Sequence, residues 1–159
     1  MSTLGDVIAG RTVHLIRPAA SAREAAAQMA ARQVSALPVV LDDDLVGIVT
    51  ERDLVQRLLA VGLDPDTTPV SQVMSSTLVT ASPAEGYAEA RARMARHRVR
   101  HLLVVAGDRL EGLVSMRDLL VVDAVEKSAE IELLTAYIYT VPPVLPPLEP
   151  ALDEWAHTL

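Results

Sequence analysis

The apolar residues of this chain fall into short uninterrupted runs, and these runs come in pairs. Residues 37–41 (LPVVL) and 102–106 (LLVVA) are each long enough for one buried strand and contain β-branched valine. A short polar turn follows each run, and a second apolar segment follows the turn, at 45–49 in the first case and at 110–114 in the second. Because turn residues between two apolar runs are typical of a hairpin, each pair predicts two antiparallel strands.

An alanine-rich segment precedes each hairpin, at residues 22–33 and 84–97. Both segments are rich in residues that favour helix, chiefly Ala, Met and Arg, so each predicts a helix. Two lead segments, at 13–16 and 78–81, come before these helices and are expected to be short and extended. A proline follows soon after each of them, and its fixed φ suits the first turn of a helix.

A second helix is predicted after each hairpin. Thr50 and Ser115 end the hairpins and are preferred N-cap residues, and an acid, Asp53 or Asp118, follows three residues later. The order of elements is therefore β-α-β-β-α in both halves, a mixed α/β (α+β) fold with units of about 50 residues. Units of this size are small for independent stability, so we expect the two to pack together.

The two halves are copies of one another. Residues 13–55 align without gaps on residues 78–120, and about 18 of the 43 aligned pairs are identical. Self-similarity at a fixed offset indicates an internal duplication. The identical pairs include residue types that are hard to match by chance: Pro18 with Pro83, Met29 with Met94, Gly47 with Gly112, and Arg52-Asp53 with Arg117-Asp118.

The duplication divides the chain into four segments. They are a first repeat at 1–61, a connector at 62–73, a second repeat at 74–125 and a C-terminal segment at 126–159. In the last segment we expect a further helix at 126–136. Residues 141–150 contain five prolines and predict an extended, polyproline-like chain.

Composition and charge narrow the function. With 14 Lys and Arg against 21 Asp and Glu, the chain has a formal net charge of −7, which repels nucleic acid and anionic lipid. Cys is absent, so disulfides and thiolate metal sites are excluded, and a reducing cytosol is the expected compartment. Since no run of about 20 apolar residues occurs either, we expect a cytoplasmic protein that binds neither nucleic acid nor membrane.

One sequence pattern occurs at the same place in both repeats. Residues 47–53 (GIVTERD) and 112–118 (GLVSMRD) share Gly, two apolar residues, Thr or Ser, two variable residues and Asp. Duplicated at this spacing, the pattern resembles a tandem pair of CBS domains (a Bateman module) of the stand-alone bacterial type, over residues from about 4 to about 122. The resemblance implies two repeats packed sheet to sheet about a pseudo-twofold axis, with clefts that can hold adenosine-containing ligands.

The resemblance also assigns ligand-binding roles. Asp53 and Asp118 would accept hydrogen bonds from ribose hydroxyls, while Thr50 and Ser115 would approach the ribose or the phosphate. A carboxylate is a good acceptor for a vicinal diol, and the N–H groups at a helix N-terminus favour a nearby phosphate. A Ser or Thr with an acid three residues later is also a common helix cap, so capping alone is the alternative.

A basic pair distinguishes the second repeat from the first. Arg100 and His101 precede its first hairpin strand, where the first repeat has Ser35 and Ala36. Nucleotide-binding members of the family, such as the regulatory subunit of AMP-activated protein kinase, often carry a basic pair there that meets phosphates, in the reverse order. The alternative is a solvated basic patch at a helix C-terminus, where cations are favoured.

The lead segments differ in one side chain that a ligand could use. Thr80 carries a hydroxyl where the first repeat has Leu15. Since the basic pair is also confined to the second repeat, we expect one better and one poorer ligand site.

The resemblance implies a regulatory binding module rather than an enzyme. The ligand would be AMP, ADP, ATP or another adenosine compound such as S-adenosylmethionine, and no cofactor is required. The sequence has neither a phosphate-binding Gly-Lys-Ser/Thr loop nor a dinucleotide fingerprint, and Ser115 lacks the context of a catalytic nucleophile. Family members commonly form dimers, so we expect a homodimer, and the proline-rich segment could dock on a protein partner.

The alternative function is a scaffold of the same fold whose clefts hold no ligand. Its work would be dimerisation and the docking of a protein partner. An adenine nucleotide would stabilise a binding module against unfolding, whereas it would leave a scaffold unchanged.

Overall fold

The computed structural model describes the backbone of residues 2–140 and the side chains of residues 2–136. Its contacts divide the chain into two units, Met1–Val125 and Glu126–Leu159. Both repeats lie in the first unit. The proline-rich segment predicted at 141–150 lies outside the described residues.

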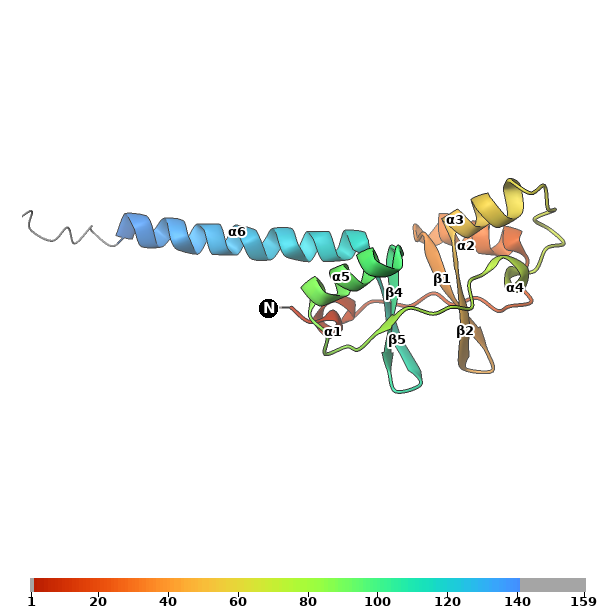
Figure 1. Ribbon diagram of the computed structural model, residues 1–159, viewed down its shortest axis with the longest axis horizontal. Coiled ribbons are helices and arrows are strands. Elements are labelled where there is room, and N and C mark those ends of the chain that lie inside the picture. Colours follow the sequence, from red (N-terminus) through yellow and green to blue (C-terminus); the bar gives the residue numbers. More distant parts are fainter. Residues whose placement is uncertain (1, 141–159) are drawn as a thin grey trace, which may run out of the picture. The chain divides into compact units, whose positions relative to one another are not determined.

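The predicted β-α-β-β-α order is present in the second repeat, whereas the first repeat lacks the leading strand (Figure 1). The short helices α1 and α4 are additional to the prediction. The short helix η1 is a π-helix that continues directly from α3. In chain order the elements are α1 (Leu4–Ile8), α2 (Ala22–Arg32), β1 (Ala36–Leu41), β2 (Asp44–Thr50), α3 (Glu51–Asp53), η1 (Leu54–Leu59), α4 (Val70–Val73), β3 (Thr80–Ala81), α5 (Tyr87–His97), β4 (His101–Ala106), β5 (Arg109–Ser115) and α6 (Met116–Thr140).

Each repeat is built on an antiparallel hairpin, as the paired apolar runs predict. β1 pairs with β2 and β4 with β5, and both hairpins have an irregularity at the same point, between Val39 and Val40 or between Val104 and Val105. The second lead segment adds a parallel strand, β3, beside β4. The first lead segment contributes a single bridge from Ile16 to Val39, so the first sheet has two strands and the second has three.

Helix α5 begins later than its composition predicts. The sequence predicts a helix from residue 84, but the helix begins at Tyr87. Before it, the N–H of Glu85 donates to the carbonyl of Ser82 (3.0 Å), and the Ser82 hydroxyl accepts a bond from the N–H of Ala84. These bonds close a turn, and local hydrogen bonds of this kind compete with helix formation.

Helix α6 is longer than predicted. The sequence predicts a separate helix at 126–136, but the structure has one unbroken helix of 25 residues, Met116–Thr140. Neither Gly nor Pro occurs between its ends, so no residue interrupts the helical hydrogen bonds. Among the described residues, no helix is both long enough and apolar enough to cross a membrane.

Two short helices pack on the opposite repeat. Leu4 and Val7 of α1, at the start of the first repeat, are buried in the core of the second, and the N–H of Leu4 donates to the carbonyl of Glu85 (2.8 Å). Val70 and Val73 of α4, which precedes the second repeat, are buried in the core of the first. Each buried aliphatic side chain contributes about 1.5–3 kcal/mol, so this exchange ties the repeats together. The boundaries predicted near residues 61 and 74 divide the sequence, but they do not divide the cores. Each core also contains residues from a short helix that lies on the other side of a boundary in the sequence.

The glycines of the repeated pattern lie where the exchanged segments cross the hairpins. A Cβ on Gly112 would lie 2.8 Å from side-chain carbons of Ile8, at the end of α1. A Cβ on Gly47 would lie 3.0 Å from the carbonyl oxygen of Ser75, just after α4. Both distances are shorter than van der Waals contact, so the close approach of each segment to its hairpin requires glycine.

The substitution Gly112→Ala should therefore lower the free energy of unfolding by about 1–3 kcal/mol, the usual cost of overpacking a well-packed site. Urea denaturation measures this change. Gly86→Ser is the matched control, because Gly86 is the N-cap of α5 and a Cβ there would meet nothing within 4 Å. Serine suits an N-cap, so the control should be as stable as the wild type or slightly more stable. An unchanged Gly112→Ala protein would contradict the packing argument.

Candidate functional site

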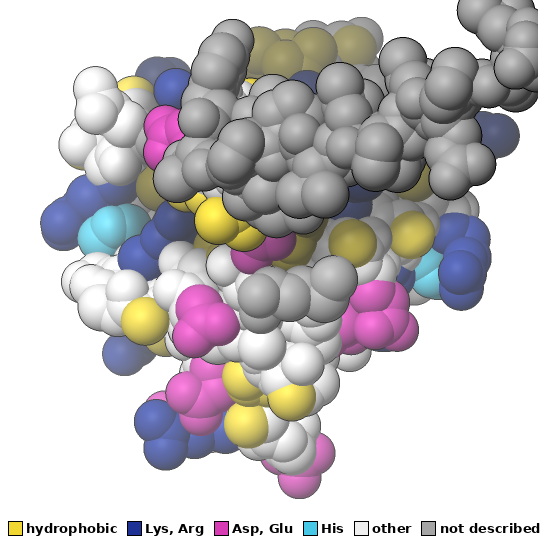
Figure 2. Space-filling model, turned by 90° about the vertical axis from the view of Figure 1, so that its left-hand side faces the viewer, with side chains coloured by type: hydrophobic (Ala, Val, Ile, Leu, Met, Phe, Trp, Pro, Cys, Tyr) yellow, Lys and Arg dark blue, Asp and Glu magenta, His cyan; other side chains and the backbone are white. Residues whose placement is uncertain are grey.

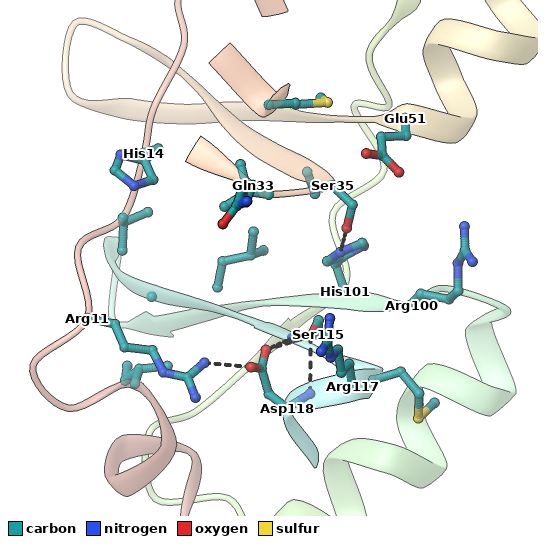
Figure 3. Close-up of a pocket in the computed structure, with 18 of the residues that line it drawn as sticks. Arg11, His14, Gln33, Ser35, Glu51, Arg100, His101, Ser115, Arg117 and Asp118 are labelled. Carbon is teal, nitrogen blue, oxygen red and sulfur yellow. Dashed lines mark hydrogen bonds and ion pairs between the residues drawn. The ribbon is translucent and has the colours of Figure 1, made fainter. Parts of the chain in front are cut away.

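Two cavities lie where the repeats meet. The larger has a volume of about 770 Å³ and is lined by residues of both repeats (Figure 3). The smaller has a volume of about 200 Å³. Small-molecule sites typically have volumes of roughly 300–1,000 Å³, so only the larger cavity falls in that range.

The larger cavity is lined by the start of helix α6 in the second repeat and by the lead segment of the first repeat. Ser115 and Asp118, both predicted site residues, line it together with Val13 and His14. Figure 3 shows Asp118 and His14 on different walls of this cavity. The exchange of α1 explains this arrangement, because the chain must run from the second repeat's core to the first repeat along this wall.

The smaller cavity has the reciprocal composition. Thr50 and Asp53 of the first repeat line it together with Thr77 and Val79, which lead into the second repeat. Thr80 lines neither of these two cavities, and its carbonyl accepts a hydrogen bond from Nη1 of Arg93 (2.7 Å). The structure therefore does not bring Thr80 together with the other predicted site residues.

Both predicted carboxylates cap a helix. The amide and hydroxyl of Ser115 donate to Oδ2 of Asp118 at 2.7 and 2.6 Å, and the amide of Asp118 donates back to the Ser115 hydroxyl at 3.2 Å. Thr50 and Asp53 make the same three bonds at 2.9, 3.0 and 3.3 Å. Capping is thus present in both repeats. In each carboxylate it uses one oxygen, Oδ2, and leaves Oδ1 outside the cap.

The second oxygen of Asp118 is paired with an arginine. Nη1 of Arg11 donates to Oδ1 of Asp118 at 2.8 Å, across the larger cavity's lower wall in Figure 3. Burial by itself raises the pKa of the Asp118 carboxyl, but the hydrogen bonds from Ser115 and then from Arg11 outweigh it, so this pKa lies below its ordinary value. Asp118 is therefore ionised at neutral pH and can accept hydrogen bonds.

The equivalent oxygen of Asp53 has a looser neighbour. Nε of Arg57 lies 3.6 Å from Oδ1 of Asp53, beyond hydrogen-bonding distance. Nη1 of Arg57 donates instead to the carbonyls of Val73 and Met74, at 3.2 and 2.8 Å. Arg57 is thus held by the backbone after α4, and it does not donate to Oδ1 of Asp53 in the way that Arg11 donates to Oδ1 of Asp118.

The predicted basic pair lies on the wall shared by the two cavities. Arg100 and His101 line both, together with Ser35 and Glu51. Nε2 of His101 and the hydroxyl of Ser35 are 2.9 Å apart, which joins the two repeats by a hydrogen bond. Burial and the nearby Arg100 cation lower the pKa of His101 below its ordinary value, and Asp118 opposes this shift weakly. His101 is therefore neutral at pH 7, and Arg100 carries the positive charge of the pair.

Arginines outnumber acids on the walls of both cavities, although the chain as a whole is acidic. On the face drawn in Figure 2, acidic and basic side chains are interspersed. The cavity walls differ from this surface because they carry more arginines than acids, so an anionic ligand is favoured inside the cavities. Arg11, Arg100 and Arg117 line the larger cavity with Glu51 and Asp118, and Arg52, Arg57, Arg98 and Arg100 line the smaller with Glu51 and Asp53.

Among the residues of the larger cavity that sequence reasoning missed are Arg11, His14, Ser35 and Glu51. Arg11 precedes the region that aligns between the repeats, and the other three have no polar counterpart of the same type in the other repeat. The packing of α1 and α4 on the opposite repeats explains why these residues line the cavity. This packing places the lead segment of one repeat beside the helix start of the other. Within the described residues there is no cluster of three His, Asp or Glu side chains able to hold a metal ion.

Comparison with known proteins agrees with the sequence pattern and the fold. The family model of the CBS domain matches twice, at residues 4–60 and 70–124. The CBS domain-containing protein YhcV of Bacillus subtilis is 37% identical over 129 residues, which cover 81% of this chain and 91% of that protein. Hypoxic response protein 1 of Mycobacterium tuberculosis is 34% identical over 96 residues, 60% of this chain and 67% of that protein.

Solved structures show the same architecture. A putative signal-transduction protein with CBS domains from Burkholderia ambifaria has a TM-score of 0.72 at 33% identity, covering 75% of this chain and 91% of that one. A CBS domain protein of Pyrobaculum aerophilum, solved in complex with AMP, has a TM-score of 0.65 at 28% identity, covering 73% and 88% of the two chains. On the two family matches and these likenesses, the chain belongs to the CBS domain family and carries two CBS domains in tandem.

Proposed function

We propose that this tandem CBS pair is a regulatory module that binds an adenosine nucleotide, AMP, ADP or ATP, in its larger cavity. The observation that carries the proposal is the meeting, in one cavity of about 770 Å³, of an ionised Asp118 with Arg11, Arg100 and Arg117. A carboxylate suits a ribose diol, and arginines suit a phosphate. The Pyrobaculum aerophilum relative was solved with AMP, which supports this choice of ligand.

The proposed roles follow from atoms that the fold positions. Oδ1 of Asp118 accepts from the ribose hydroxyls, because Oδ2 is used by the helix cap. The N-terminus of α6, a helix of 25 residues, provides the positive end of a helix dipole for the phosphate. Arg100 forms an ion pair with the phosphate, and His101 forms a hydrogen bond with it. Binding regulates a partner only if the ligand prefers one arrangement of the repeats over another.

The protein is also proposed to work as a homodimer in the cytoplasm. Each repeat leaves large apolar side chains exposed on its second helix, including Leu59 (63%) in η1 and Val121 (58%) and Val125 (64%) in α6. Apolar side chains gathered on equivalent helices of both repeats suit a self-complementary interface.

Binding of AMP should raise the unfolding temperature of the wild type and not that of Asp118→Ala. A ligand at 100 times its dissociation constant stabilises the folded state by about 2.7 kcal/mol, a change that thermal-shift measurements detect easily. Asp53→Ala is the matched control, because it removes the same helix cap from the first repeat and leaves the larger cavity intact. It should lose stability without ligand, yet keep its response to AMP. No response of the wild type to AMP, ADP or ATP would instead favour a scaffold that works through protein partners.

The imidazole of His101 should titrate below pH 6.5 without ligand, and AMP should raise its pKa. Burial and Arg100 disfavour the charged ring, whereas a phosphate beside it favours that ring. NMR chemical shifts of His101 against pH measure both values. Arg100→Ala should raise the pKa of His101 in the free protein, and adenosine, which has no phosphate, should leave it unchanged.

The folded-state pKa of His101 is lower than that of the unfolded chain, so its contribution to stability is complete above about pH 6.5. This contribution should be lost as the pH falls through the lowered pKa. An AMP complex in which the pKa of His101 stays where it is in the free protein would contradict its placement beside the phosphate.

Light scattering at micromolar concentration should give twice the chain mass of 17.1 kDa. Leu59→Glu should shift the protein toward the monomer, because a charge on an apolar interface must be desolvated. Leu41→Glu is the control, since Leu41 is similarly exposed (51%) but lies at the end of β1. A monomeric wild type, or equal masses for the two variants, would contradict the proposed interface.

A further inference from the structure

The carboxylate proposed to receive the ribose has only one oxygen available, and an arginine already binds it. Oδ2 of Asp118 accepts both cap bonds from Ser115. Oδ1 accepts from Nη1 of Arg11 at 2.8 Å (Figure 3). A ribose diol that approaches Asp118 therefore meets the guanidinium of Arg11 at the same atom.

Arg11 is held less firmly than the equivalent arginine of the other repeat. Arg57 is fixed by two backbone carbonyls and stands 3.6 Å from its carboxylate. The guanidinium of Arg11 donates to Asp118 and to no backbone carbonyl of the described residues, and its side chain is 47% exposed, much like that of Arg57 (49%). Arg11 also follows Gly10, whose φ of +72° marks a sharp change of chain direction after α1. An ion pair whose arginine is half-exposed contributes little free energy, so a ligand can displace Arg11 from Asp118.

The consequence of displacing Arg11 depends on the charge of the ligand. A nucleoside without phosphate replaces a cation at Asp118 with neutral hydroxyls and returns the guanidinium to water. A nucleotide brings an anion into the same cavity, and guanidinium groups pair strongly with phosphate. The released Arg11 can then exchange its carboxylate partner for the phosphate.

We propose that Arg11 is a specificity-determining gate of the larger cavity, which disfavours nucleosides at Asp118 and favours nucleotides. The inference rests on the proposed function, since it assumes that the ribose binds at Asp118. It adds that selection between adenosine and AMP comes from a residue outside the aligned repeats. Arg11 and Arg100 then act differently, because Arg100 only attracts the phosphate, whereas Arg11 also competes with the ribose.

Isothermal titration of AMP and of adenosine tests this difference. Arg11→Ala should bind adenosine about threefold more tightly than the wild type, because the competitor at Oδ1 is gone. It should bind AMP about threefold more weakly, because a phosphate partner is gone, so the preference for AMP over adenosine should fall about tenfold. Arg100→Ala should weaken AMP binding alone and leave adenosine binding unchanged.

Arg23→Ala is the matched control, since Arg23 forms an exposed ion pair with Asp66 and lines neither cavity. It should bind both compounds as the wild type does. If Arg11→Ala keeps the wild-type preference, or changes both affinities in the same direction, the gate is overturned and the proposed function stands. If the wild type binds neither adenosine nor any of AMP, ADP and ATP, the proposed function is overturned and the gate with it.

Discussion

The exchange of short helices between the repeats is the constraint on which both cavities depend. Leu4 and Val7 are buried in the core of the second repeat, while Ile16, a few residues later, already pairs with Val39 of the first. The chain between them must cross from one repeat to the other, and residues 11–14 line the larger cavity on the way. The segment after α4 makes the reciprocal crossing beside the smaller cavity, where Ser75 pairs with Ile48. Each short helix is buried in the core of the opposite repeat, and the chain segment that follows it forms a wall of one cavity. Two repeats without this exchange would lack these walls.

On the proposed function, the capping bonds that begin the second helices also orient the carboxylates for a ligand. A carboxylate that accepts two bonds at Oδ2 is fixed in orientation, so its other oxygen points in one direction. Capping and ligand binding are thus compatible, because they use different oxygens of one side chain. The repeats differ in the arginine beside the second oxygen, and that difference comes from segments outside the duplicated pattern: Arg11 lies before the alignment, and Arg57 after it. The duplication provides two capped carboxylates, Asp53 and Asp118, in equivalent positions. Arginines from segments outside the alignment give these two carboxylates different surroundings.

The sequence predicted the parts of the molecule that are local and missed those that depend on crossing from one repeat to the other. Both hairpins, helix α2 and the caps at Thr50 and Ser115 follow from runs and spacings of a few residues. The start of α5 was predicted too early because the hydrogen bonds of Ser82 favour a turn over helical propensity. Residues 126–136 are helical as predicted, but they continue the helix of the second repeat without the expected break, because no residue there interrupts the helix. Arg11 could not be predicted as a partner of Asp118, since their contact spans 107 residues and depends on where α1 packs.

The position of the basic pair limits what the two cavities can do together. Arg100 and His101 lie on the wall that both cavities share, and the first repeat has Ser35 and Ala36 at the aligned positions. Because His101 is neutral at pH 7, Arg100 alone brings positive charge to that wall, where Glu51 adds a negative charge to both sides. On the proposed function, phosphates in the two cavities would share only this cation, since the other arginines line one cavity each, and like charges on either side of a shared wall repel one another. A second anion would then bind more weakly than the first, although each cavity has its own carboxylate and its own arginines.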